Sequence, residues 1–452
     1  MRTARIHRFA ALTLAAGATV AVMAACSSSP NSDNSATGNV TITVNCEPPT
    51  SDPIDRKNFV ADIAIFEKAN PNIHITPKDE FPCDDPKTFD AKLAGGQQEN
   101  VFYVYYTDVA HVVANGQAAD INGDVSGVTG LGDIQQSTLD VFKGPNGHLY
   151  GLPKTNYSMG LLYNLALFTQ AGLDPNKPPT TWDEVRADAK KITALGNGTV
   201  GFADYSASNQ GGWHFTAELY SQGGSMVTPD GKQAAFNSPQ GKAVLTNLQQ
   251  MRWTDNSMGS KQLLTIPDVQ AMMGAGKLGM YLAAPDNLPT LVKQYQASYD
   301  NLSITAMPGD HATLLGGDGY MFNVKDTPAQ IKAGLKWLQF ENLTPGAGQF
   351  NYQRAAAAGA PVGLPEPDLW TGATATADNQ AKAKYANVPA QNYQLFENAM
   401  KTKQGKIEPP AAQEIYSVLD GVMSAVLTNQ GANIDQLLSD ASNKANSLLA
   451  NQ

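Results

Sequence analysis

This chain has only three cysteines, six histidines and a small share of charged residues, which limits the classes of protein to which it can belong. With 16% of its residues charged and 42% hydrophobic, the sequence has the composition of a globular protein. It contains no cluster of basic residues and its formal net charge is −10, which argues against binding to nucleic acids or to anionic membrane surfaces. Beyond the N-terminal residues, no segment is apolar enough to span a membrane.

The common catalytic and cofactor motifs are also missing. The sequence has no GxSxG, no HExxH and no P-loop, and its histidines are scattered. A GxGxxG match at residues 196–201 follows a predicted helix and precedes a predicted strand, which is the reverse of a dinucleotide-binding turn. We therefore expect no catalytic residues, no metal and no cofactor. Because carboxylates are plentiful, an extracellular glycan-active enzyme stays open as an alternative.

Residues 1–25 are typical of an export signal. A basic end precedes an apolar run over residues 9–24, which is shorter than the roughly 20 residues of a membrane-spanning helix. The run ends in Met-Ala-Ala-Cys at Cys26, which resembles a bacterial lipobox and implies cleavage before a lipid-carrying cysteine. The Ser-, Asn- and Asp-rich residues 26–38 then form a lipid anchor and flexible tether. The alternative is an ordinary secreted protein with a chance cysteine.

Cys46 and Cys83 remain after Cys26, and an exported protein with two such cysteines predicts a disulfide. Each cysteine follows a strand-like segment, residues 40–44 and 73–76, and a helical pattern lies between them. In a βαβ unit the two strands are parallel and their carboxyl ends are near each other, so a bridge is geometrically reasonable. A metal site is disfavoured because neither cysteine lies in a CxxC.

Helix-like and strand-like segments alternate through the rest of the chain. The apolar segment 101–106 predicts a central strand, and Thr181-Trp-Asp-Glu184 predicts a capping box that opens a helix. The last third is mostly helical in pattern. Roughly 425 residues remain after signal cleavage, which exceeds the size of one hydrophobic core and predicts two α/β domains.

Several ordered segments carry a resemblance to a known family. They are Phe66–Ile73, Gly147–Pro153, Leu161–Asn164, Pro179–Glu184, Gly223-Gly224 with Phe236–Ser238, Met272–Met280 and Gly316–Tyr320. In this order and spacing they resemble the extracellular solute-binding proteins of carbohydrate ABC importers, the maltose-binding-protein-like family.

The resemblance implies an α/β, type II periplasmic-binding-protein-like fold with two lobes, a hinged cleft and a helical C-terminal part. It places residues 39–152 and 323–360 in lobe 1, and residues 153–318 and 361–452 in lobe 2. Chain crossings are expected near 152–154, near 317–322 and within 355–375. The partners that it implies are a carbohydrate ligand and the transmembrane permease subunits of an ABC importer. The protein itself is expected to be a monomer on the outer face of the cell membrane.

Sugars present hydroxyl groups and apolar ring faces, so a sugar site needs aromatic platforms with carboxylates and amides. By resemblance, Trp213 lies where the family places a stacking aromatic, although a core tryptophan is the alternative. Tyr157 lies where maltose-binding protein carries an acidic ligand residue. Asp286 and Asn287 stand where many relatives have a tryptophan, which favours a smaller or more polar ligand than a maltodextrin.

The remaining candidates have weaker support. Tyr106, Thr107 and Asp108 follow the third predicted strand, and Asp108 could instead be a helix N-cap. Asp318 and Tyr320 lie on the expected hinge strand, and Glu47 follows the first strand. Other ligands of the same fold, a polyol, a glycerophosphodiester or a peptide, stay open. The scarcity of arginine weakens a phosphate ligand.

Overall fold

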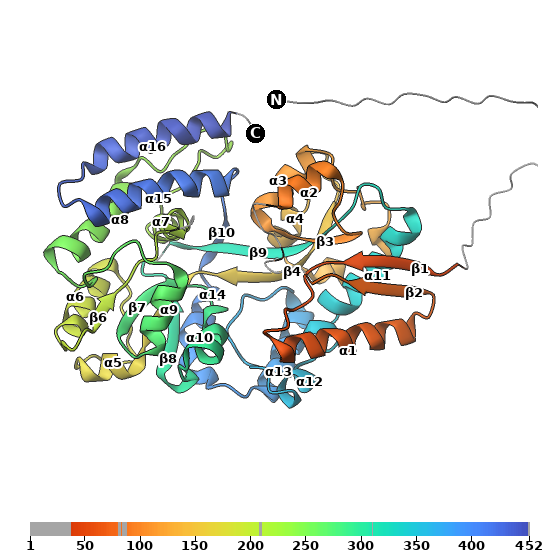
Figure 1. Cartoon of the computed structure of the whole chain (residues 1–452), viewed down its shortest axis with the longest axis horizontal. Coiled ribbons are helices and arrows are strands. Elements are labelled where there is room, and N and C mark those ends of the chain that lie inside the picture. Colours follow the sequence, from red (N-terminus) through yellow and green to blue (C-terminus); the bar gives the residue numbers. More distant parts are fainter. Residues whose placement is uncertain (1–37, 80–82, 84–87, 208–209, 310, 451–452) are drawn as a thin grey trace, which may run out of the picture. The chain divides into compact units, whose positions relative to one another are not determined.

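The computed structural model describes residues 38–79, 83, 88–207, 210–309 and 311–450. The predicted signal peptide, the tether and the lipidation site Cys26 lie outside the described residues. Residues 38–452 form one compact unit by their internal contacts. Within this unit the fold is mixed α/β, as the sequence predicts, with two sheets and helices around both (Figure 1).

The first sheet has the strand order β10-β9-β3-β1-β2, with β4 also paired to β9. The predicted βαβ unit is confirmed, because β1 and β2 are parallel and α1 connects them. Four of the five residues of β3 are buried, in agreement with its predicted central place. Tyr106 is an exception, since it begins a helix instead of ending this strand. The strands of this sheet are β1 (Val40–Val44), β2 (Ile73–Pro77), β3 (Val101–Tyr105), β4 (Gly151–Ser158), β9 (Ala312–Phe322) and β10 (Gln404–Ile407).

The second sheet has the order β6-β7-β5-β8 and is almost completely buried. Its central strands β5 and β7 are antiparallel, and every residue of both is buried, as the apolar sequence of each requires. Apolar side chains pack on both faces of this sheet in two separate core clusters. The strands are β5 (Gly160–Asn164), β6 (Val200–Phe202), β7 (Leu278–Ala283) and β8 (Leu302–Ala306).

Two long antiparallel strands, β4 and β9, lie side by side and link the two sheets (Figure 1). The end of β9 pairs with β3 of the first sheet, and β4 leads directly into β5 of the second. Two glycines of β9 lie where any side chain would collide with a neighbouring aromatic ring. A Cβ on Gly316 would lie 2.2 Å from the Tyr157 ring, and one on Gly317 would lie 2.6 Å from the Tyr106 ring. The Gly-Gly pair therefore lets two aromatic rings pack directly on this strand.

Helices cover both sheets. Around the first sheet lie α1 (Pro53–Ala69), α2 (Phe89–Gly95), α3 (Tyr106–Ala114), α4 (Gln136–Val141) and α11 (Pro328–Asn342). Around the second lie α5 (Leu165–Gln170), α6 (Trp182–Thr193), α7 (Gln210–Ser221), α8 (Pro239–Gln249), α9 (Ile266–Gly274), α10 (Asn287–Tyr295), α14 (Gln394–Met400), α15 (Ala412–Thr428) and α16 (Ile434–Leu449). Trp182 and Trp337 are both buried and belong to the hydrophobic cores. The predicted helical C-terminal part is confirmed.

The segment between α11 and α15 contributes to both cores. It includes α12 (Tyr352–Ala357) and α13 (Gly372–Tyr385). Leu364 packs beside the second sheet, Trp370 lies in the core of the first, and Tyr393 lies again beside the second. Residues 361–452 therefore do not all pack on one sheet, and the lobe boundaries given above stay a prediction.

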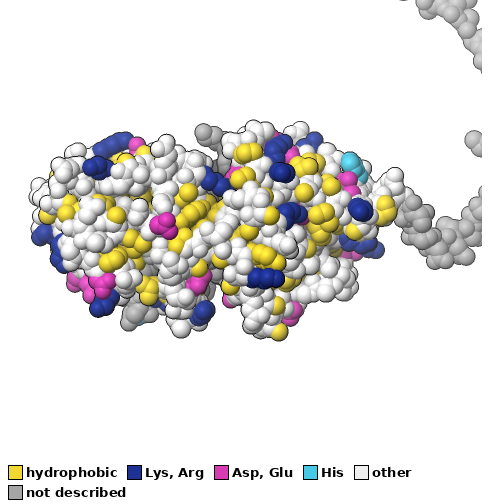
Figure 2. Space-filling model, turned by 90° about the horizontal axis from the view of Figure 1, so that it is seen from below, with side chains coloured by type: hydrophobic (Ala, Val, Ile, Leu, Met, Phe, Trp, Pro, Cys, Tyr) yellow, Lys and Arg dark blue, Asp and Glu magenta, His cyan; other side chains and the backbone are white. Residues whose placement is uncertain are grey.

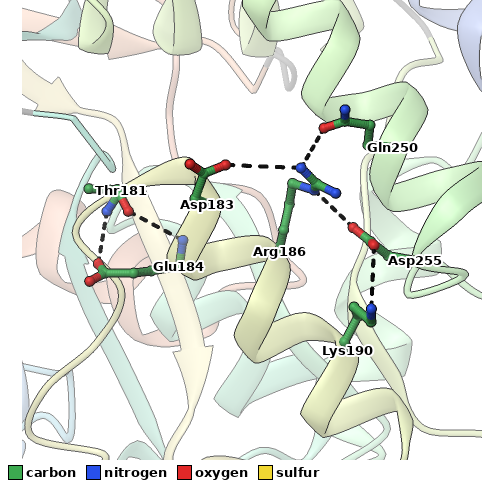
Figure 3. A network of polar contacts seen from close by, with 7 residues as sticks. All are labelled: Thr181, Asp183, Glu184, Arg186, Lys190, Gln250 and Asp255. Atoms are coloured by element: carbon green, nitrogen blue, oxygen red, sulfur yellow. Dashed lines mark hydrogen bonds and ion pairs between the residues drawn. The ribbon is translucent and has the colours of Figure 1, made fainter.

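Helix α6 begins with the predicted capping box. Glu184 N–H donates to Thr181 Oγ1 over 3.2 Å, and Thr181 N–H donates to Glu184 Oε2 over 3.1 Å (Figure 3). Two residues after Glu184, Arg186 donates through Nε to Asp255 Oδ2 over 2.8 Å and also contacts Gln250. These contacts join α6 to the residues that follow α8, where Gln250–Thr254 form one π-helical turn.

The predicted disulfide is present between Cys46 and Cys83, whose Cα atoms are 4.9 Å apart. Among the residues that the structure describes, no helix combines the length and the apolar character that crossing a membrane requires. On the face shown in Figure 2, the described basic and acidic side chains are interspersed and form no extended patch of one sign.

Candidate functional site

A cleft of about 570 Å³ lies where the carboxyl ends of strands from both sheets meet. Tyr105 ends β3, Asp286 follows β7, and Glu408 directly follows β10. The described residues that line the cleft are Phe89, Asp90, Tyr105, Thr107, Asp108, Ala110, His111, Tyr157, Gln210, Trp213, Ile266, Ala284, Asp286, Asn287, Gly317, Glu408, Pro410, Ala411, Ala412, Gln413, Glu414 and Tyr416. Six of the ten candidate ligand residues are in this set: Thr107, Asp108, Tyr157, Trp213, Asp286 and Asn287.

An aromatic wall is formed by Tyr157 on β4 and Trp213 on α7. Their ring centroids are 6.0 Å apart and the planes meet at 72°, an edge-to-face arrangement. Trp213 is half-buried, packs against both core clusters of the second sheet and still borders the cleft. It is therefore neither a core tryptophan nor a free surface residue. Its position suits a ring that stacks on an apolar ligand face.

Asp286 and Asn287 lie at the start of α10, at one side of the cleft. Asn287 is held in one orientation, because its Oδ1 accepts from Gln270 Nε2 over 2.9 Å and from Tyr281 OH over 3.2 Å. Its Nδ2 donates to Asp286 Oδ1 over 3.3 Å. The Asp286 carboxylate makes no side-chain cap to its own helix and is exposed toward the cleft. The surrounding cleft walls raise its pKa to about 6 through desolvation.

Glu408 is the most informative residue that sequence reasoning missed. It lies in the turn between β10 and α15, and its Oε1 accepts from Tyr416 OH over 2.9 Å. Burial raises the pKa of Glu408 to about 7, although the hydrogen bond from Tyr416 opposes this shift. The sequence did contain one signal near this residue. The Pro409-Pro410 pair that follows Glu408 indicates a turn, here at the end of a short strand. That strand was not recognised, because four residues alone do not specify their pairing with β9.

Thr107 and Asp108 lie in the first turn of α3, on the side of the first sheet. Thr107 Oγ1 donates to Asp108 Oδ2 over 2.7 Å. The N-cap position belongs to Tyr105, so the alternative role of Asp108 as an N-cap is wrong. Desolvation raises the pKa of Asp108 as well.

The other four candidates do not border the cleft. Tyr106 is 4% exposed and donates to Asn156 Oδ1 over 2.7 Å, because it turns toward the core below β9. Tyr320 is also 4% exposed and lies in the core of the first sheet. Asp318 accepts from Tyr103 OH over 2.7 Å and from Thr155 over 2.8 Å within the linking strands. Glu47 pairs with Arg56 over 2.9 Å and is 7% exposed. Their existing partners explain their place outside the cleft.

Within the described ranges, no group of three or more His, Cys, Asp or Glu side chains is arranged to hold a metal ion. The arrangement in the cleft instead offers ring faces, carboxylate oxygens and amide groups around one shared volume. Such groups recognise a small solute by shape, stacking and hydrogen bonds.

Comparisons with known proteins agree with this geometry. Residues 50–341, more than half of the chain, match the family model described as bacterial extracellular solute-binding protein. A putative binding protein of Brucella abortus is 30% identical over 150 residues, which cover 32% of this chain and 36% of that protein. The sn-glycerol-3-phosphate-binding periplasmic protein UgpB of the same species is 48% identical over 58 residues, 13% of each chain. The matches thus span only about a third or less of these relatives' lengths.

Solved structures share the fold over nearly the whole chain. A solute-binding protein of Thermotoga lettingae, bound to α-D-tagatose, has a TM-score of 0.72 at 20% identity and covers 90% of this chain and 99% of its own. UgpB of Mycobacterium tuberculosis, in complex with glycerophosphocholine, has a TM-score of 0.72 at 16% identity, with 92% and 99% covered. These likenesses confirm the type II periplasmic-binding-protein fold that the sequence predicts. With the family-model match, they show that the chain belongs to the bacterial extracellular solute-binding proteins.

Proposed function

We propose that this protein captures a carbohydrate in the cleft and delivers it to the permease of an ABC importer, without catalysing a reaction on it. The observation that carries the proposal is the cleft wall, where Tyr157 and Trp213 border the same volume as Asp286 and Asn287. A sugar needs this combination, because its ring faces are apolar and its edges carry hydroxyl groups. Closure of the cleft by bending of the linking strands β4 and β9 would signal occupancy to the permease.

We propose that Trp213 is the main stacking platform, and that Asp108, Asp286 and Asn287 hydrogen-bond ligand hydroxyls. Glu408 joins them from the C-terminal segment, since it borders the same cleft. Tyr106, Asp318, Tyr320 and Glu47 are left out, because each is engaged with other protein groups or in the core.

Thermal unfolding of the purified protein against a panel of solutes tests the proposal. The panel contains mono- and oligosaccharides, polyols, glycerophosphodiesters and peptides. A ligand that binds only the folded state adds about 2.7 kcal/mol of stability at a hundredfold excess over its Kd. We expect a shift with a sugar that Trp213→Ala abolishes.

Trp253→Ala is the matched control. Trp253 is half-buried and donates to the Val426 carbonyl over 2.9 Å, away from the residues that line the cleft. It should lower the unfolding temperature without changing the ligand-induced shift. A shift with a peptide or a glycerophosphodiester and with no sugar would contradict the carbohydrate assignment while keeping a binding function.

We also propose that the protein is lipid-anchored at Cys26 on the outer face of the membrane. The Met-Ala-Ala-Cys sequence after an apolar run supports this anchor. Metabolic labelling with a radioactive fatty acid in a bacterial host tests it. We expect labelled, membrane-bound protein from the full chain and unlabelled protein from Cys26→Ala. Equal labelling of both would rule out Cys26 as the lipid site.

A further inference from the structure

The cleft has an unbalanced charge. Five carboxylate residues line it, namely Asp90, Asp108, Asp286, Glu408 and Glu414, and none of its described lining residues is Lys or Arg. Among the lining residues that the structure describes, only His111 has a side chain that can become cationic, and it lies near Asp90, with 3.4 Å between Nε2 and Oδ1. The described lining of the cleft therefore supplies acidic groups without a lysine or arginine to balance them.

Three of these carboxylates have neutral hydrogen-bond donors and, among the residues that the structure describes, no lysine or arginine partner. Asp108 accepts from Thr107, Asp286 from Asn287 and Glu408 from Tyr416. Among the described residues, none of the three forms an ion pair within 4.0 Å, although other carboxylates of the chain do so with arginine. A carboxylate that is held in place by a neutral donor keeps its charge available to a ligand.

The aromatic residues of the cleft suit a cation as well. Tyr105, Tyr157, Trp213 and Tyr416 border the same volume, and the face of an aromatic ring attracts a positive charge. Phe89 adds a further ring. By contrast, an anionic ligand would meet five carboxylates without the arginine fork that phosphate recognition usually recruits.

We propose that the ligand of this cleft carries a positive charge, as does a carbohydrate bearing a free amino group. The proposal rests on the proposed function and specifies its substrate class. An ammonium group between Asp286 and Glu408 would find carboxylates and ring faces together, while the rest of the sugar stacks on Trp213. Desolvation raises the pKa of both carboxyl groups, which is the expected effect where no protein cation compensates them.

Titration calorimetry with matched sugar pairs tests this. The probes are glucosamine, galactosamine and deacetylated chitobiose, each against its N-acetylated form, with glucose and galactose as further neutral references. We expect the amine of at least one pair to bind about tenfold or more tightly than its neutral forms, and the preference to shrink in high salt.

Substitutions of single carboxylates test which of them bind the amino group of the ligand. Asp286→Asn and Glu408→Gln should each weaken binding of the amine about tenfold more than they weaken binding of its acetylated partner. Asp183→Asn is the matched control, since Asp183 is 92% exposed on α6 and does not line the cleft. A neutral sugar that binds as tightly as its amine overturns the charged-ligand proposal and leaves the proposed function standing. Binding of peptides or glycerophosphodiesters and of no sugar overturns the proposed function itself.

Discussion

Carboxylates occupy two contrasting environments in this protein. In the packed interior, Asp62 is paired with Arg354 and Asp255 with Arg186, and both acids are at most 4% exposed in their side chains. In the cleft, Asp286 and Glu408 are held by a neutral amide and a phenol, and neither has an ion-pair partner among the described residues.

The difference separates two uses of the same functional group. A buried carboxylate costs free energy unless a cation and hydrogen bonds compensate it, so the interior pairs are structural. A carboxylate at the wall of a cleft can leave part of its interactions to a ligand. Substitutions should therefore affect stability in the first environment and binding in the second.

The largest effect on stability is expected from Arg354→Met. It leaves the Asp62 carboxylate buried without a cation, so the free energy of unfolding should fall by about 3–5 kcal/mol, measured by urea denaturation. The double variant Asp62→Leu with Arg354→Met should recover much of this loss, because no unpaired charge remains. Affinity for the ligand should not change in either variant. A loss below about 1 kcal/mol in the single variant would contradict the structural role of the pair.

Arg186→Met should have a smaller effect of the same kind. Asp255 would lose its 2.8 Å partner but keep Lys190, whose Nζ is 3.8 Å away (Figure 3). We expect the free energy of unfolding to fall by about 1–3 kcal/mol. If the loss equals that of Arg354→Met, Lys190 contributes nothing to the stabilisation of the Asp255 carboxylate.

Asp286→Asn should change how stability depends on pH in the absence of ligand. The pKa of Asp286 is raised from 3.8 to about 6, mainly by desolvation and with a small contribution from Glu366. Between about pH 4 and pH 6 the folded chain keeps a proton that the unfolded chain has lost, so this carboxyl group lowers stability as pH rises. Compared with the wild type, Asp286→Asn should therefore gain unfolding temperature from pH 4 to pH 8.

Calorimetric unfolding scans of both proteins at pH 4, 6 and 8 provide the measurement. Asp62→Asn is a useful contrast, because it leaves the Arg354 guanidinium without its carboxylate partner and should destabilise the protein at neutral pH. A constant difference between Asp286→Asn and wild type across the three pH values would show that Asp286 has an ordinary pKa.

The smallest effect is expected from Asp183→Asn. Its carboxylate is 92% exposed, and its nearest contact to Arg186 is 4.0 Å. Such a surface pair contributes about 0–1 kcal/mol, so both the free energy of unfolding and ligand affinity should stay within about 0.5 kcal/mol of wild type. A larger loss of affinity would mean that charge far from the cleft acts on the ligand, which would weaken the comparison.

Local patterns in the sequence determined much of the fold. The capping box at Thr181 and Glu184, the βαβ unit with its disulfide and the buried strand β3 all follow from residues close together in the chain. The order of short family segments predicted the fold class. These features depend on local hydrogen bonding and on hydrophobic periodicity, which a sequence displays directly.

The tertiary structure alone decided which polar residues face the cleft. Tyr106 and Thr107 are neighbours, yet one turns to the core and the other to the cleft, because one residue along a helix rotates a side chain by about 100°. Glu408 enters the cleft only because β10 pairs with β9 across more than 80 residues of sequence. The cleft's excess of carboxylates over cations is likewise a property of contacts between distant segments, and no stretch of the sequence shows it by itself.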